Sequence, residues 1–75
     1  MNTTTRPLTA DQIDVLAVVR DGRITCAQLA DDYYDGDRVR ARRILVQLHT
    51  RGLVRPWRVD PRYWVVTDDG RDALA

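Results

Sequence analysis

The sequence predicts an α+β domain with a three-helix core, a two-stranded β-hairpin and a short C-terminal helix. Three segments carry apolar residues at helical spacing, and each follows a residue that favours a helix N-cap. A later stretch rich in β-branched and aromatic residues is divided by an Asp-Pro turn, which is typical of a hairpin. The length of 75 residues suits one domain. We expect a flexible leader over residues 1–7 and a folded domain over residues 8–75.

The first two helices are predicted from their caps. Thr9 and Gln12 have the spacing of a capping box, and the helix that follows is expected to end at Asp21-Gly22. Its inner face, at i, i+3 and i+4 spacing, is predicted to consist of Ile13, Leu16 and Ala17. The second helix is expected to follow Thr25 as its cap and to cover residues 26 to about 33.

The third helix is the best-defined element. It is expected to begin after Asp37, to end near residue 51 and to be followed by Gly52 as a C-terminal glycine. Its buried residues recur at i, i+3, i+4 and i+7 and are Ala41, Ile44, Leu45 and Leu48. The opposite arc of this helix is therefore exposed and basic.

The hairpin is predicted from two strands around the turn Asp60-Pro61-Arg62. The strands are expected over residues 53–59 and 63–66, because both are rich in valine and aromatic residues. Thr67 is expected to cap a final short helix over residues 68–75.

The predicted order of elements is that of a winged helix-turn-helix: a helix, a short extended piece at Arg23-Ile24, two helices and a hairpin. The chain resembles winged helix-turn-helix regulators of the MarR and PadR type over residues 24–30, 45–54 and 63–74. Residues 45–54 carry the pattern Leu-x-x-Leu-x-x-x-Gly-Leu-Val at the junction of helix and wing. The resemblance implies that the third helix enters a DNA major groove and that the hairpin lies on the backbone or minor groove. The chain differs from the MarR family by ending at Ala75, without the long C-terminal helices through which those proteins dimerise.

The positive charge is concentrated in one part of the chain. Residues 38–58 contain seven arginines and no acidic residue. Residues 1–37 hold three Arg and seven Asp, a net charge of −4, whereas residues 38–75 hold nine Arg and four Asp, a net charge of +5. Such separation indicates a one-signed surface of the kind that binds phosphate. The competing interpretation is a solvated helix face that forms salt bridges to the acidic turn.

Double-stranded DNA is the expected partner, bound in a sequence-specific way by a small transcriptional regulator or a phage-type accessory factor. Arginine bonds guanine and glutamine pairs with adenine in the major groove, so the expected base-reading residues are Arg40, Arg43 and Gln47. The residues expected to contact phosphates or a narrow minor groove are Arg38, Arg42, Arg55, Arg58 and Arg62. The alternative is a winged-helix interaction module that binds an acidic protein partner with the same basic face.

Other classes of site are not expected. The single Cys26 and the lone His49 exclude a disulfide framework and do not have the spacing of a metal site, so we expect no metal, cofactor or enzymatic activity. The acidic residues 31–37 lack the pattern of a calcium loop. No signal peptide, membrane span or small-molecule effector site is indicated, and the expected compartment is the cytoplasm. Trp57 and Trp64 either stack a base or, more commonly for such pairs, pack across strands over the third helix.

The first helix is expected to join two copies of the chain, either as a weak homodimer or as a monomer that pairs on DNA. Apolar residues occur around much of this helix, which is unusual for one that faces solvent on its outer side. The residues predicted to form the seam are Val15 and Val18, with Leu74 beside them.

Overall fold

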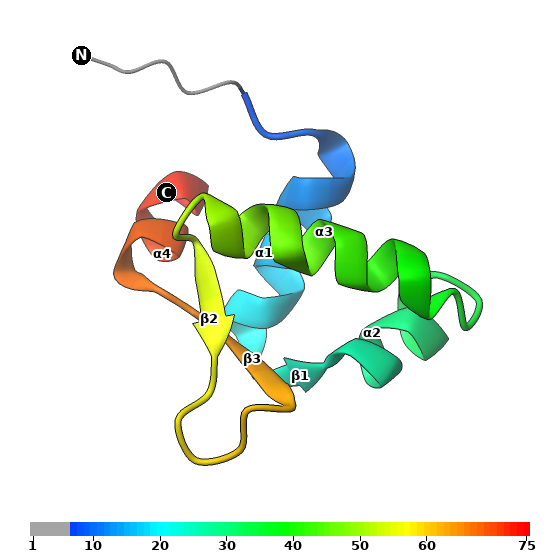
Figure 1. Ribbon diagram of the computed structural model, residues 1–75. Helices are drawn as coiled ribbons and strands as arrows, with labels where there is room; N and C mark the ends of the chain where they lie inside the picture. Colours follow the sequence, from blue (N-terminus) through cyan, green and yellow to red (C-terminus); the bar gives the residue numbers. More distant parts are fainter. Residues whose placement is uncertain (1–6) are drawn as a thin grey trace.

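The computed structural model describes residues 7–75, so the expected leader lies, apart from Pro7, outside the described residues. The described part folds into four α-helices and a three-stranded antiparallel sheet (Figure 1). The elements in order are α1 (Ala10–Asp21), β1 (Ile24–Thr25), α2 (Cys26–Tyr33), α3 (Arg38–Thr50), β2 (Val54–Pro56), β3 (Tyr63–Val66) and α4 (Asp68–Leu74). The predicted α+β class and the predicted order of helices and hairpin are confirmed.

Each helix begins at its predicted cap. In every case the cap side chain accepts a hydrogen bond from a backbone N–H in the first turn, and the caps are Thr9, Thr25, Asp37 and Thr67. The capping box of α1 is reciprocal, because the Thr9 N–H donates in return to the Gln12 side chain at 3.0 Å. The start of α2 is also a capping box, with Gln28 as the returning side chain. These local bonds fix where the helices start.

The sheet has the order β1-β3-β2, so the last strand in the sequence is the central one. Trp64 of β3 lies opposite Ile24 of β1, and Val66 of β3 lies opposite Val54 of β2. The sequence predicted a short extended piece at residues 23–24 and a two-stranded hairpin, but it did not predict that this piece pairs with the hairpin as a third strand. β2 is also shorter than predicted and ends at Pro56, which has no N–H to continue the ladder.

The core is formed by one side of each helix and the inner side of the sheet. Its most completely buried side chains are Leu16, Leu29, Leu45, Leu48, Val15, Val19 and Val54. All four residues predicted for the buried stripe of α3 are in this core. Burial of apolar side chains from α1, α2, α3 and β2 in one cluster makes residues 7–75 a single packing unit.

The predicted inner face of α1 was wrong at Ile13 and right at Leu16, which is fully buried, while Ala17 is partly buried. Ile13 is 44% exposed, whereas Val15 is 1% exposed and belongs to the core. Apolar residues occur on several sides of α1, so its periodicity does not decide which side packs; α3 and β3, which contact it, decide that. Val15 consequently cannot lie on a dimer surface. Val18 and Leu74 are partly buried against the same core, and the homodimer itself stays a prediction.

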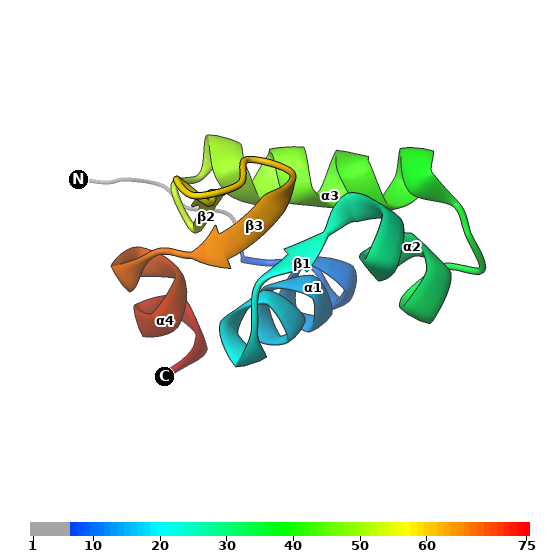
Figure 2. The same ribbon diagram turned by 90° about the horizontal axis from the view of Figure 1, so that it is seen from below.

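The helices lie on two sides of the molecule. Figure 2 shows α3 along one side, with the loop between β2 and β3 reaching that same side, while α1 and α4 lie toward the other. No helix in residues 7–75 has the length and hydrophobicity that a membrane span requires. The side formed by α3 and the loop carries most of the predicted site residues.

Candidate nucleic-acid interface

The position of the buried stripe of α3 determines which of its residues point away from the core. Because Ala41, Ile44, Leu45 and Leu48 face the core, the helical period turns Val39, Arg43, Val46 and Thr50 outward. Val39 is 70% exposed and Val46 is 42% exposed, so the strip combines one guanidinium with apolar surface. We call these four residues the outer strip.

The end of α3 is held by the connection to β2. Gly52 has a positive φ of 76°, a conformation that glycine adopts without strain. The next N–H, that of Leu53, donates to the carbonyl of Leu48 at 3.0 Å. This closure turns the chain directly from α3 into the sheet and fixes the hairpin beside the helix.

Five of the predicted arginines are exposed and form no ion pair with any carboxylate of residues 7–75. These residues, which we call the open arginines, are Arg38, Arg42, Arg43, Arg55 and Arg58. Three of them are on α3, one is on β2 and one is in the loop that follows β2. Their charges are available to an anionic partner because no neighbouring acid in the described chain neutralises them at short range.

Arg40 behaves differently from the open arginines. Its Nη2 donates to Asp11 Oδ2 of α1 at 2.9 Å, and its guanidinium lies 4.8 Å from the centre of the Tyr34 ring. The hydrogen bond to Asp11 raises the pKa of Arg40, which stays charged. The Arg40 side chain is therefore directed toward α1 rather than along the outer strip.

Gln47 is also turned toward α1. The amide Nε2 of Gln12 donates to Gln47 Oε1 at 3.0 Å, which links α1 and α3 through neutral side chains. Of the three residues predicted to read bases, only Arg43 lies on the outer strip, and Arg40 and Gln47 share the flank that faces α1. This bonding was missed because the partners are 29 and 35 residues apart in the sequence.

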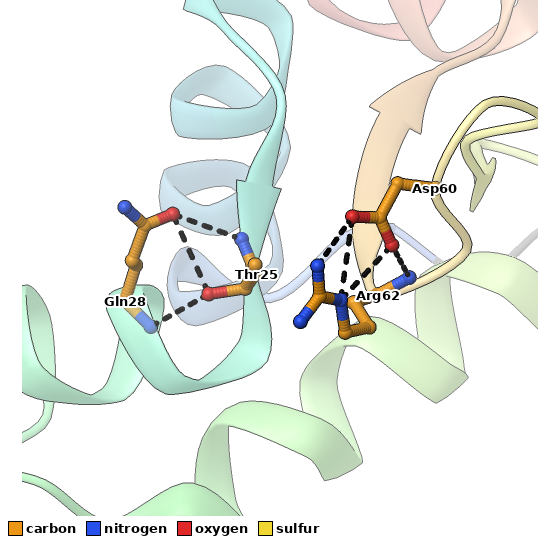
Figure 3. Close-up of polar contacts among 4 residues, drawn as sticks. All are labelled: Thr25, Gln28, Asp60 and Arg62. Atoms are coloured by element: carbon orange, nitrogen blue, oxygen red, sulfur yellow. Dashed lines mark hydrogen bonds and ion pairs between the residues drawn. The ribbon is translucent and has the colours of Figure 1, made fainter.

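Arg62 is paired within its own loop. Its Nη2 donates to Asp60 Oδ2 at 2.7 Å and its Nε donates to Asp60 Oδ1 at 3.1 Å, as Figure 3 shows. These bonds lower the pKa of the Asp60 carboxyl. The Tyr63 N–H donates to the Asp60 carbonyl at 3.0 Å, which confirms the predicted turn. Arg62 therefore contributes less net positive charge to the surface than the open arginines do.

The two tryptophans lie in different environments. Trp64 packs on α3, with its ring 5.7 Å from that of His49 in an edge-to-face arrangement. Trp57 lies just after β2, with the Tyr63 ring 6.0 Å away and the Arg23 guanidinium 4.0 Å from its ring centre. Packing across the strands over the third helix was the favoured alternative for both residues; Trp64 packs on α3, and Trp57 packs on Tyr63 across the hairpin. The contact of Arg23 was missed, because only the pairing of β1 with β3 brings this residue to the hairpin.

Cys26 lies where α2 meets the start of α3. Its thiol donates to the Arg38 carbonyl oxygen across 3.6 Å. Burial raises the pKa of the Cys26 thiol, and this effect outweighs the opposing influence of Arg42 and Arg38. The thiol is therefore mainly protonated at neutral pH. In residues 7–75, no three of the His, Cys, Asp and Glu side chains are grouped so that they could hold a metal ion.

Comparisons of the chain with models of protein families, with curated proteins and with solved structures found no match. The class defined by the fold and the site is a small α+β protein with an arginine-rich surface on α3 and the adjoining hairpin.

Proposed function

We propose that this protein is a winged helix-turn-helix that binds double-stranded DNA, with α3 in the major groove and the hairpin loop on the backbone or minor groove. The order α1, β1, α2, α3, β2, β3 with a three-stranded sheet supports this fold. The single observation that carries the proposal is that the open arginines belong to α3 and the hairpin, which reach the same side of the molecule (Figure 2).

The outer strip suits a base-reading role. Arg43 presents a guanidinium that can bond both acceptors of guanine, and Val39 and Val46 present methyl groups that can contact thymine. Arg38 and Arg42 lie toward the flank of α3 that adjoins Cys26 and the sheet, where a phosphate backbone would run. Arg55 and Arg58 extend the positive surface along the hairpin.

Binding to DNA is expected to depend steeply on salt. Each phosphate that an arginine neutralises lowers the slope of log affinity against log salt concentration by about 0.9, so the four open arginines other than Arg43 give a slope of roughly −3.6. Fluorescence anisotropy with a labelled duplex at several salt concentrations measures this slope. Arg55→Ala or Arg58→Ala is expected to reduce its magnitude by about one unit, since either change removes one phosphate contact.

Arg20→Ala is the matched control for the salt dependence. Arg20 is at the last turn of α1 and pairs with Asp21, so its loss changes the net charge equally without touching α3 or the hairpin. An equal effect of Arg20→Ala would show that the slope reports net charge alone. Absence of binding at low salt would remove DNA as the partner and leave the second candidate, an interaction with an acidic protein, which the exposed Val39 and Val46 on the outer strip favour.

Arg43→Ala is expected to reduce sequence discrimination more than overall affinity. Loss of a guanidinium at a base edge costs about 1–3 kcal/mol at one base pair. Duplexes selected from a random pool, followed by single base-pair changes in the selected site, measure the discrimination. Arg42→Ala, on the adjacent flank of the same helix, is expected to weaken all sequences alike. Uniform weakening by Arg43→Ala would contradict the base-reading assignment.

A further inference from the structure

A groove of about 500 Å³ lies between α1 and α2, away from the outer strip. Its lining includes the carboxylates of Asp11 and Asp14, the partly buried Val18 and the fully buried Leu29. Tyr33 and Tyr34 add two aromatic rings. A volume in the range of about 300–1,000 Å³ with an apolar floor and a few convergent polar groups is typical of a small-molecule site.

One guanidinium already sits in this groove. Arg40 lines it, bonded to Asp11 at 2.9 Å and positioned over the Tyr34 ring at 4.8 Å. Asp14, one helical turn after Asp11, forms no ion pair with any residue of the described chain. Tyr33 is 58% exposed and makes no ring contact within residues 7–75. Asp14 and Tyr33 thus bring a second acid and a second ring to the groove, in addition to the Asp11 and Tyr34 that hold Arg40.

We propose that this groove binds a small organic cation with a flat apolar body, such as an amidinium or guanidinium attached to an aromatic ring. The cationic head lies at Asp14 and Asp11, where its charge is complementary to the two carboxylates. The apolar body lies over Val18 and the face of Tyr33, where aromatic contact favours a delocalised cation.

Occupation of the groove also affects α3, because Arg40 belongs to that helix. A ligand that bonds Asp11 competes with Arg40 and releases its guanidinium toward solvent. This step rests on the proposed function: a released Arg40 adds one positive charge to the surface that binds DNA. Ligand and DNA then strengthen each other's binding, because coupling between two sites is reciprocal.

The first test compares benzamidine with benzamide, which has a similar shape but no charge. In an NMR titration of ¹⁵N-labelled protein, benzamidine is expected to shift the amide signals of residues that line the groove, with saturation. Benzamide is expected to bind at least about threefold more weakly, since it lacks the ionic interaction. Equal binding of both compounds, shifts centred on another surface, or no saturation would each overturn the proposal.

Two substitutions in the groove test where benzamidine binds, and they are expected to change its affinity in opposite directions. Asp14→Asn is expected to weaken benzamidine binding about two- to fivefold, as for the loss of one exposed ion pair. Asp32→Asn removes the same charge from α2 at a position that does not line the groove, and it is expected to have a smaller effect. Equal effects of the two variants would mean that benzamidine responds only to net charge, and would overturn the site.

Arg40→Gln is expected to strengthen benzamidine binding, because it frees Asp11. Its control is Arg42→Gln, the same charge change on the other flank of α3, where no groove carboxylate is in contact. If Arg40→Gln strengthens benzamidine binding no more than Arg42→Gln does, then the ligand does not compete with Arg40 for Asp11. Far-ultraviolet circular dichroism of each variant shows that the helices are retained.

Addition of benzamidine to the DNA titration tests the coupling separately. Tighter DNA binding with the unsubstituted protein, and no change with Arg40→Gln, is the expected result. If DNA affinity does not respond while the NMR titration still maps to the groove, the coupling is wrong and the cation site stands. If the protein binds no DNA at all, the proposed function fails, and the NMR titration still decides the cation site by itself.

Discussion

Gly70→Ala is expected to destabilise the protein by about 1–3 kcal/mol or more, the usual cost of forcing an extra group into a packed site. Gly70 is buried in α4, and a Cβ there would lie 2.6 Å from Val66 Cγ2 and still closer to the Leu53 carbonyl oxygen. That carbonyl is fixed, since it accepts a hydrogen bond from the Thr67 N–H at 3.0 Å. Alanine is the better helix former by about 1 kcal/mol, and the steric clash outweighs this gain.

Urea unfolding monitored by tryptophan fluorescence measures the effect of Gly70→Ala as a lower midpoint. Gly22→Ala is the matched control, because a Cβ at Gly22 meets no atom within 4 Å and the backbone there is extended. Its midpoint is expected to stay close to that of the unsubstituted protein. A Gly70→Ala protein as stable as the Gly22→Ala protein would show that α4 does not pack this closely on the turn before β2.

Val15→Asp is expected to have the larger effect, with a loss of about 3 kcal/mol or more in the free energy of unfolding. Val15 is almost fully enclosed, so a carboxylate there loses its hydration without gaining a partner. A chain of 75 residues has a total stability of roughly 4–11 kcal/mol. The substitution therefore removes a large share of the stability, and an appreciable fraction of the protein is expected to be unfolded in dilute buffer.

Ile13→Asp, half a turn away on the same helix, is the control for Val15→Asp. Ile13 is largely exposed, so the same change in chemistry is expected to cost less than about 1 kcal/mol. Circular dichroism and urea midpoints compare the two. If Val15→Asp folds normally while Ile13→Asp unfolds, α1 packs through the face that its sequence first suggested.

The contrast between α1 and α3 shows what the sequence can predict. In α3, arginines surround a single apolar stripe between a good cap and a C-terminal glycine, so the buried face could be identified without knowing its neighbours. In α1, apolar residues point in several directions, and only the positions of α3 and the sheet determine that Val15 rather than Ile13 is buried. Local signals decided where both helices start, but tertiary contacts decided how α1 is turned.

The candidate site was predictable in its charge and less so in its geometry. Arg43 could be placed outward from helical spacing alone. The pairing of Arg40 with Asp11 and of Gln47 with Gln12 depends on how α1 crosses α3, which no local pattern encodes. The pairing of β1 with β3 was missed for a similar reason: two residues are too few to show the alternation that would indicate a strand within a sheet.

The central position of β3 also affects how the protein is made. Both β1 and β2 form their ladders only with β3, and they pair with residues 63–66, near the end of the chain. During synthesis α1, α2 and α3 can form as they emerge, but β1 and β2 have no partner strand until residues 63–66 have followed them. Until then Ile24 and Val54 have no strand to cover them. The nascent chain therefore carries an unpaired β1 throughout the synthesis of α2, α3 and β2, and the arrival of β3 assembles all three strands at once.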